Sequence, residues 1–407
     1  MTQVELQSKV YRVAPATRRF SYLTAPDGDW LAVVDGQTTI QRFVDDQALW
    51  VEAGDGFRHA ESGLLLAASP GEQPGAVRLS LGGEAPDRRY LGADGAPGAA
   101  AGFTVGLGPE KRPSEYLAEF QAQGWVALTQ ILPPAVLEGL QRLAGTDAFE
   151  GPGEERMQQL ALGPALARAM VEPVSLWLCR EYMRTPDIKL GHPPSVTALT
   201  PDDGARPVQG WHSDFPYMWG SERARRAYRV PPGSDELCLA IQRNICVSDF
   251  RVDNGATVFK LGSHAAGQIA PEPWGRARDT YRPEHRAEHG LPYAGPETDI
   301  IEAPAGTILL YDARTWHRAG VNTTNRRRGA VIQAITPGFI IPFYPLGPPY
   351  KGFLESDVPA QLTERERREI EALMVHRITG PMGVFAIGVD DALTERIRNP
   401  QAPSAAY

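Results

Sequence analysis

Residues 208–217 read VQGWHSDFPY, and residues 311–317 read YDARTWH. His212 and Asp214 stand two residues apart, so both side chains leave the same face if this segment is an extended strand. Two imidazoles and one carboxylate form the facial triad that leaves coordination positions open on a non-heme Fe(II) ion. We therefore expect one metal site to be made by His212, Asp214 and a second histidine from a distant strand, His317.

Short apolar strands surround both stretches and predict a β-rich core for this part of the chain. The strand patterns cover residues 236–247, 257–261, 306–311 and 329–336, and an Asp-Asn-Gly turn at 253–255 joins the first two. Two strands that each supply ligands can enclose a metal centre inside an antiparallel jelly roll. The expected fold is therefore mainly β, with flanking helices and a jelly roll that carries the site.

Helices are expected before these strands. Ser114 is positioned to cap a helix over residues 115–120, and Gly124 ends it. A second helical pattern covers residues 133–143, where proline occupies the first turn, and a third covers residues 157–184. These helices lead into the strands that carry the candidate ligands.

Residues 1–108 predict a separate all-β accessory domain without catalytic motifs. Its strand patterns alternate with Asp-Gly, Pro-Gly and Gly-Gly turns and cover residues 30–34, 39–44, 48–51, 63–67 and 77–81. Residues 92–102 consist mostly of Gly and Ala and are interpreted as a linker. Residues 109–407 are expected to form the catalytic domain, in which a charged helix at 362–374 is an outer support or an oligomer contact.

The composition is that of an ordinary soluble protein, with 407 residues, 42% hydrophobic and 22% charged. The formal net charge of −8 argues against nonspecific nucleic-acid binding, which requires a basic surface. No apolar run of about 18 residues predicts a membrane span, and the N-terminus lacks a signal-peptide pattern. We expect a cytoplasmic protein with reduced, buried cysteines that acts on a small molecule.

An ordered set of motifs lies around the candidate ligands. The chain presents Gln209-x-x-His212-x-Asp214, then DNGAT at 253–257, GSH at 262–264, and His317 followed eleven residues later by an arginine. With the helix and strand at 116–128, this order resembles the phytanoyl-CoA dioxygenase family of Fe(II)- and 2-oxoglutarate-dependent oxygenases. The resemblance spans roughly residues 114–345 and implies a double-stranded β-helix, that is, a cupin-like jelly roll.

The resemblance implies a role for each motif residue. His212, Asp214 and His317 would bind iron, and Arg328 would bind the distal carboxylate of 2-oxoglutarate. A guanidinium fork suits this task because it pairs with a carboxylate through two parallel charge-assisted hydrogen bonds. Arg326 and Arg327 are adjacent competitors for Arg328, and the matching positions Gln209 and Thr257 would help to hold the cosubstrate.

The implied reaction consumes dioxygen and 2-oxoglutarate and releases succinate and carbon dioxide while a small organic substrate is oxidised. Halogenating relatives carry Ala or Gly at the position of Asp214, so the carboxylate predicts hydroxylation, or desaturation or ring formation, and not halogenation. Phe215, Tyr217 and Trp219 follow the first two ligands and could form an apolar lid over the substrate or fill core space. The arginine-rich run at 222–229 could hold an anionic substrate or form a solvated face.

Two other classes of protein fit parts of the pattern. A metal-containing or sugar-binding jelly roll would use the scaffold for recognition alone, and it would not need open metal positions. A zinc-dependent hydrolase also uses three protein ligands and a water, but it gives Arg328 no evident task. Release of succinate distinguishes the oxygenase from both.

Overall fold

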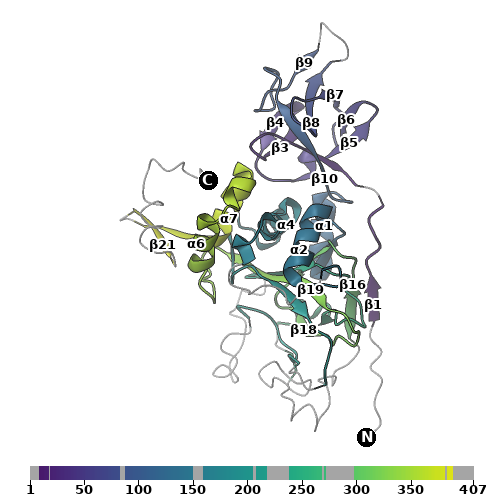
Figure 1. Cartoon of the computed structure of the whole chain (residues 1–407), viewed down its shortest axis with the longest axis vertical. Coiled ribbons are helices and arrows are strands. Elements are labelled where there is room, and N and C mark those ends of the chain that lie inside the picture. Colours follow the sequence, from purple (N-terminus) through teal and green to yellow (C-terminus); the bar gives the residue numbers. More distant parts are fainter. Residues whose placement is uncertain are drawn as a thin grey trace.

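The computed structural model shows a mainly β protein in which helices pack against the sheets (Figure 1). It describes residues 9–17, 19–82, 88–149, 159–204, 208–217, 238–267, 270–271, 298–380 and 383–387, except for the side chains of residues 378–387. The predicted fold class is confirmed. Within these residues, no helix combines the length and the apolar character needed to cross a membrane.

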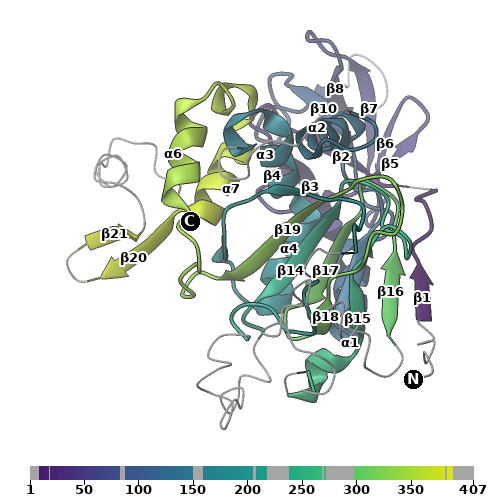
Figure 2. The same cartoon turned by 60° about the horizontal axis from the view of Figure 1, so that its bottom comes forward.

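A six-stranded antiparallel sheet forms the larger wall of the jelly roll. Its central strands lie side by side in Figure 2 and are β17 (Ile308–Asp312), β14 (Ile241–Cys246) and β19 (Arg328–Pro337). The flanking strands are β11 (Trp125–Leu128), β12 (Ile188–Leu190) and β13 (Val196–Leu199). The strands predicted at 306–311 and 329–336 are confirmed to within a few residues at their ends.

A four-stranded sheet forms the smaller wall, in the order β1 (Lys9–Arg12), β16 (Asp299–Glu302), β15 (Val258–Lys260) and β18 (Trp316–Arg318). Phe259 and Ile301 of this wall share one apolar cluster with Cys246 and Tyr311 of the larger wall. The two sheets therefore face each other, as in a jelly roll. β1 pairs in parallel with β16, so the first described strand belongs to this wall (Figure 1).

The central strand β14 separates a helix-covered face from the interior between the walls. Arg243 points outward and its Nε donates to Ser175 Oγ at 2.9 Å. Asn244 and Cys246 alternate onto the opposite face, and Cys246 joins the cluster between the two walls. The outer face is covered by α1 (Pro113–Gln123), α2 (Pro134–Ala144), α3 (Pro164–Met170) and α4 (Pro173–Met183).

The first helix begins two residues earlier than predicted. Pro113 is its first residue, and Glu115 accepts a hydrogen bond from the backbone N–H of Arg112 at 2.8 Å. The predicted capping role of Ser114 is wrong, because its hydroxyl instead donates to Asp46 at 2.5 Å. Proline at the first helical position needs no capped N–H, which explains the earlier start. The predicted end at Gly124 is confirmed.

Gly124 is a position where an added side chain has two costs. Its φ of 76° is left-handed, and a Cβ atom there would lie 2.3 Å from Cε1 of His264. Gly36 has a φ of 77°, but nothing lies within 4 Å of its Cβ position. Gly124→Ala is therefore expected to lower the free energy of unfolding by about 2–4 kcal/mol, against about 1 kcal/mol for Gly36→Ala. Urea denaturation checks both values, and equal losses would mean that the His264 ring gives way.

The predicted N-terminal all-β region is present and has its own core. Its strands are β2 (Ser21–Thr24), β3 (Trp30–Val34), β4 (Gln37–Gln41), β5 (Trp50–Ala53), β6 (Gly56–His59), β7 (Leu65–Pro70), β8 (Ala76–Leu81), β9 (Arg89–Tyr90) and β10 (Gly102–Leu107). β10 pairs with both β8 and β2, so the strands β2, β5, β6, β7, β8 and β10 close into a ring. Trp50, Phe57 and Phe103 are buried within this unit.

The Gly- and Ala-rich segment at 92–102 is not a linker. Leu91 forms a bridge with Pro97, and the N–H of Ala101 donates to the carbonyl of Leu91 at 2.9 Å. Gly102 then begins β10. Small residues allow this compact turn. The same Gly- and Ala-rich composition is typical of linkers, which explains the wrong interpretation. The division of the chain near residue 108 stays a prediction.

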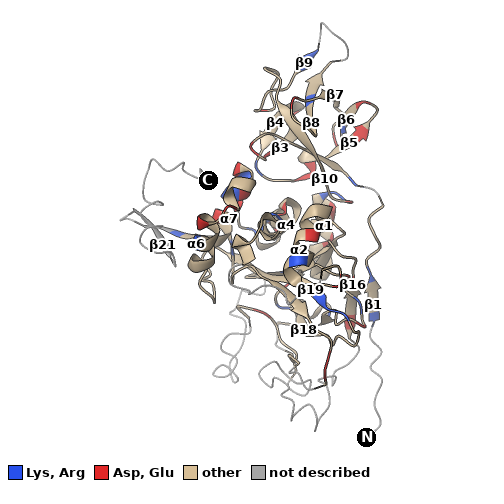
Figure 3. Ribbon diagram, viewed as in Figure 1, with Lys and Arg blue, Asp and Glu red and all other residues tan. Residues whose placement is uncertain are grey.

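The charged helix near the end of the chain is α7 (Glu364–Met374), which buries one face and exposes Glu364 and Arg367, and its role as an outer support or oligomer contact stays a prediction. Glu369 is 3% exposed and accepts hydrogen bonds from Arg180 of α4 at 2.6 Å and from Arg42 at 3.1 Å. Glu369 therefore links α4 with the N-terminal unit, and α7 carries charged residues of both signs (Figure 3). The helix is preceded by α6 (Gly347–Glu355) and followed by a hairpin of β20 (His376–Gly380) and β21 (Gly383–Ile387).

Candidate metal centre

His212, Asp214 and His317 meet in space although the chain separates the histidines by more than a hundred residues. The backbones of His212 and His317 pair antiparallel through two hydrogen bonds of 2.9 Å. Asp214 Oδ1 lies 3.6 Å from His212 Nε2, and Asp214 Oδ2 lies 3.1 Å from His317 Nε2. Among the described residues, these three form the one group whose ligand atoms all lie within 4.8 Å of one another and could hold a metal.

Both imidazoles are held in the orientation that a metal ligand requires. Nδ1 of His212 donates to the carbonyl of Gly210 at 2.8 Å, and Nδ1 of His317 donates to the carbonyl of Thr315 at 2.9 Å. In each ring, Nδ1 thus donates to the carbonyl of the residue two positions earlier in the chain. With Nδ1 used in this way, Nε2, the atom that faces Asp214, is the one available to bind a metal.

The electrostatics of the triad favour neutral His212 and ionised Asp214. Burial, followed by the nearby His317, lowers the pKa of His212 to about 4. Burial opposes ionisation of Asp214, but His317 and His212 outweigh it and lower the pKa of this carboxyl group. Burial opposes the charge on His317, yet Asp214 outweighs it and raises the pKa of the ring. A bound cation would displace the proton that His317 shares with Asp214.

The structure distinguishes the three consecutive arginines. Arg328 is 9% exposed at the start of β19, its Nη2 donates to the carbonyl of Gly255 at 3.1 Å, and its guanidinium lies 4.4 Å from the Phe250 ring centroid. The side chain of Arg326 is 74% exposed. Arg327 donates to the carbonyl of Gly145, the residue that follows α2. Arg328 is thus the buried member of the set.

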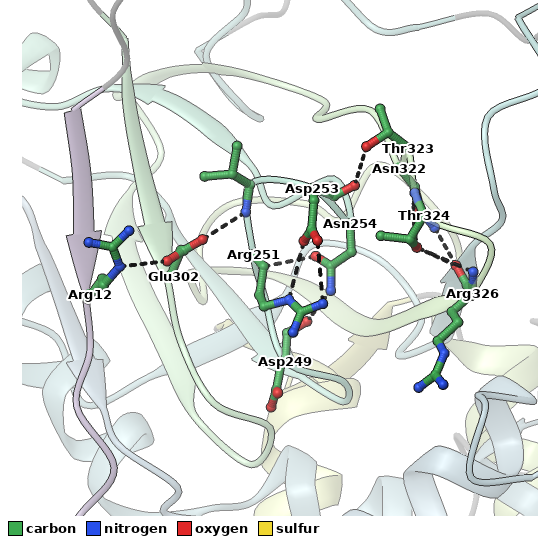
Figure 4. A network of polar contacts seen from close by, with 11 residues as sticks. Arg12, Asp249, Arg251, Asp253, Asn254, Glu302, Asn322, Thr323, Thr324 and Arg326 are labelled. Carbon is green, nitrogen blue, oxygen red and sulfur yellow. Dashed lines mark hydrogen bonds and ion pairs between the residues drawn. The ribbon is translucent and has the colours of Figure 1, made fainter.

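A polar network fixes the turn that contacts Arg328 (Figure 4). The carbonyl of Asp253 accepts hydrogen bonds from the N–H and the hydroxyl of Thr323 at 2.8 and 2.9 Å. On the other side, Glu302 accepts from the N–H of Val252 and from Arg12 Nε, each at 3.1 Å. The turn is therefore attached both to the segment after His317 and to the edge of the smaller wall.

The remaining predicted site residues have different surroundings. Gln209 is exposed and Thr257 is partly buried. Phe215 is buried with its ring centroid 4.8 Å from that of Phe343. The hydroxyl of Tyr217 accepts a hydrogen bond from the N–H of Leu239 at 2.7 Å. Trp219 and the arginine-rich run at 222–229 lie outside the described residues, and the roles of all these residues stay predictions.

Sequence reasoning gave no role to two residues near the triad. His192 accepts a hydrogen bond from the N–H of Ala334 at 3.3 Å, and its ring centroid lies 5.3 Å from that of Phe343. Burial lowers the pKa of His192, while the charge of Asp214 acts in the opposite direction. Phe343 thus lies between His192 and Phe215. No motif marks either residue, because both come from loops at the ends of strands.

A jelly roll with two histidines and one carboxylate at the edge of its interior defines a class of metal-dependent proteins. A model of the family described as Phytanoyl-CoA dioxygenase (PhyH) matches residues 120–330, just over half of the chain. The chain belongs to this family, and its class is that of Fe(II)/2-oxoglutarate-dependent oxygenases.

Solved structures with partial similarity include two proteins. SnoN, a non-heme alpha ketoglutarate dependent epimerase from nogalamycin biosynthesis, is 17% identical, and the match covers 56% of this chain and 81% of that chain with a TM-score of 0.36. HygX from Streptomyces hygroscopicus, solved with nickel, 2-oxoglutarate and hygromycin B, is 18% identical, with 56% and 88% covered and a TM-score of 0.39.

Proposed function

We propose that this protein is a non-heme Fe(II)- and 2-oxoglutarate-dependent dioxygenase that hydroxylates a small organic substrate. The observation that carries the proposal is the triad itself, in which two Nε2 atoms and one carboxylate converge inside a jelly roll. The reaction would couple substrate oxidation to the decarboxylation of 2-oxoglutarate to succinate and carbon dioxide.

The donor set fits Fe(II). Two neutral imidazoles and one carboxylate would hold the ion and leave positions open for other ligands. The iron, when bound, activates dioxygen for oxidation of the substrate. His212 can serve as a neutral ligand because its pKa is about 4, and the lowered pKa of Asp214 keeps its carboxylate charged.

Arg328 fits the distal carboxylate of 2-oxoglutarate better than its two neighbours do. Its guanidinium is buried, and Gly255 and Phe250 restrict its orientation. A buried guanidinium can form charge-assisted hydrogen bonds that water would otherwise weaken. A zinc hydrolase would have no task for this group, which is why the oxygenase is the function we favour.

The proposal is tested by anaerobic titration of the protein with Fe(II) and 2-oxoglutarate. Chelation of iron by the 2-oxo acid end is expected to give a weak visible charge-transfer band. In Arg328→Ala the band is expected to need about 10–100-fold more 2-oxoglutarate, because hydrogen bonds to a charged group are worth about 1.5–3 kcal/mol. Iron content is expected to stay unchanged. Arg326→Ala is the matched control, since its side chain is exposed.

Each outcome of this titration assigns the site differently. A band that needs more 2-oxoglutarate in Arg328→Ala alone supports the proposed site. An unchanged affinity in Arg328→Ala would transfer the role to another cation. If iron binds and no band forms in the wild type, the cosubstrate assignment fails and the hydrolase or binding-scaffold alternatives replace it.

A further inference from the structure

The turn between β17 and β18 contacts both segments that supply the candidate ligands. The carbonyls of residues 313–315 accept hydrogen bonds, in order, from the N–H of Asp214 at 2.8 Å, the hydroxyl of Ser213 at 2.9 Å and Nδ1 of His317 at 2.9 Å. Ser213 lies between the first two ligands of the triad. Three successive carbonyls therefore set the relative position of the two ligand segments.

Asp312 shapes this turn and is fully buried. Its carbonyl accepts from the N–H of Thr315, and its Oδ1 accepts from the N–H of Arg314, both at 2.9 Å. This side-chain contact to the backbone two residues on is an Asx turn. The guanidinium of Arg314 then folds back on the same carboxylate, with Nε 2.9 Å from Oδ1 and Nη2 2.6 Å from Oδ2.

The turn is also attached to the helix layer behind the larger wall. The N–H of Asp312 donates to the carbonyl of Gly124 at 2.9 Å, at the end of α1. The hydroxyl of Tyr182 in α4 donates to Asp312 Oδ2 at 3.1 Å. Tyr182 in turn stacks on Phe120 of α1, with ring centroids 3.8 Å apart. The carboxylate therefore has partners on both sides and cannot shift without breaking several contacts.

We propose that Asp312 and Arg314 are positioning residues, which hold the 313–315 carbonyls and thereby the three metal ligands in binding geometry. This inference rests on the proposed function, because it requires that the triad binds a metal. Neither side chain is a ligand. Both act through the backbone that contacts Asp214, Ser213 and His317.

A purely structural role explains the ion pair less well. Burying a charged pair costs desolvation that its mutual attraction barely offsets, so such a pair contributes little net stability. Residues that orient metal ligands from behind typically change metal affinity about 10–100-fold when they are replaced. Apolar side chains at these two positions would avoid the desolvation cost. A role in holding the three carbonyls therefore explains better why a charged pair is found here.

The test measures Mn(II) affinity, by the loss of the free Mn(II) electron paramagnetic resonance signal, in the full-length protein. Manganese accepts imidazole and carboxylate ligands and gives this readout without turnover. Asp312→Asn keeps an oxygen for the turn but removes the charge that holds Arg314, so we expect affinity to fall about 10–100-fold. Arg314→Gln is expected to behave similarly, and Arg314→Lys, which keeps the charge, is expected to recover part of the loss.

Glu369→Gln is the matched control, because it also disrupts a buried arginine pair, with Arg180, but in α7. Its Mn(II) affinity is expected to equal that of the wild type even where urea denaturation shows lower stability. If the Asp312 and Arg314 variants bind Mn(II) as the wild type does, or lose no more affinity than Glu369→Gln, the positioning role is overturned. If the wild type binds Mn(II) no more tightly than His212→Ala does, the proposed function itself fails. This result differs from failure of the positioning role alone, in which the wild type still binds Mn(II) more tightly than His212→Ala.

Discussion

Asp214→Ala is expected to leave the protein folded but unable to form succinate from 2-oxoglutarate. The substitution removes the charged ligand and leaves two imidazoles, so Fe(II) affinity is expected to fall by more than about a hundredfold, beyond the range seen when groups behind a ligand are replaced. His212→Ala is expected to give the same loss. Bound iron is measured after anaerobic dialysis, and succinate is measured in the same samples.

Asp55→Ala provides the control for this experiment. Asp55 is an exposed carboxylate in the turn between β5 and β6 of the N-terminal unit. Its replacement is expected to change neither iron content nor succinate formation. Full turnover in Asp214→Ala would rule out the triad as the iron site.

Glu369→Ala is expected to have the largest effect on stability. The carboxylate contacts Arg180 at 2.6 Å and Arg42 at 3.1 Å, and its side chain is 3% exposed. Removing it takes the carboxylate away from the buried Arg180 and the partly buried Arg42, which costs about 3–5 kcal/mol. Urea denaturation measures the change. Glu138→Ala breaks the exposed pair with Arg142 and is expected to cost no more than about 0.5 kcal/mol.

The same contacts predict how acid affects the protein. Burial would raise the pKa of Glu369, but Arg180 and then Arg42 outweigh it, so the pKa lies below the ordinary value of 4.5. The stabilisation is therefore complete above that value and is lost as the pH falls through the lower pKa of the folded state. The difference in unfolding free energy between wild type and Glu369→Gln is expected to shrink over this acid range. A difference that grows on acidification would contradict the ion-pair assignment.

The meeting of the three candidate ligands could be predicted because its signal is local. A spacing of two residues puts His212 and Asp214 on one face of an extended segment, and the strand pattern at 306–311 comes shortly before His317. The choice among Arg326, Arg327 and Arg328 could not be made in this way. That choice depends on which arginine is buried when β13 pairs with β19. The sequence alone does not distinguish three adjacent arginines.

The buried ion pairs could not be predicted from the charged segments. The alternating Glu and Arg of residues 364–371 are equally compatible with a solvated face and with an interface of paired charges. Only the tertiary fold brings Asp29 within 2.6 Å of Arg368 and Arg180 within 2.6 Å of Glu369. The proposed positioning role of Asp312 and Arg314 could not be predicted for a similar reason, because their contacts come from three distant parts of the chain.

The parallel pairing of β1 with β16 makes the N-terminal unit resemble an insertion and not a detachable preceding module. The chain places one strand in the smaller wall, continues through the closed ring of β2 to β10, and then returns to build the rest of the jelly roll (Figure 1). A truncation that starts near residue 109 would remove that strand and expose the backbone edge of β16. Unpaired edges invite association with other chains, so such a fragment would be a poor substitute for the intact protein in crystallisation or assay.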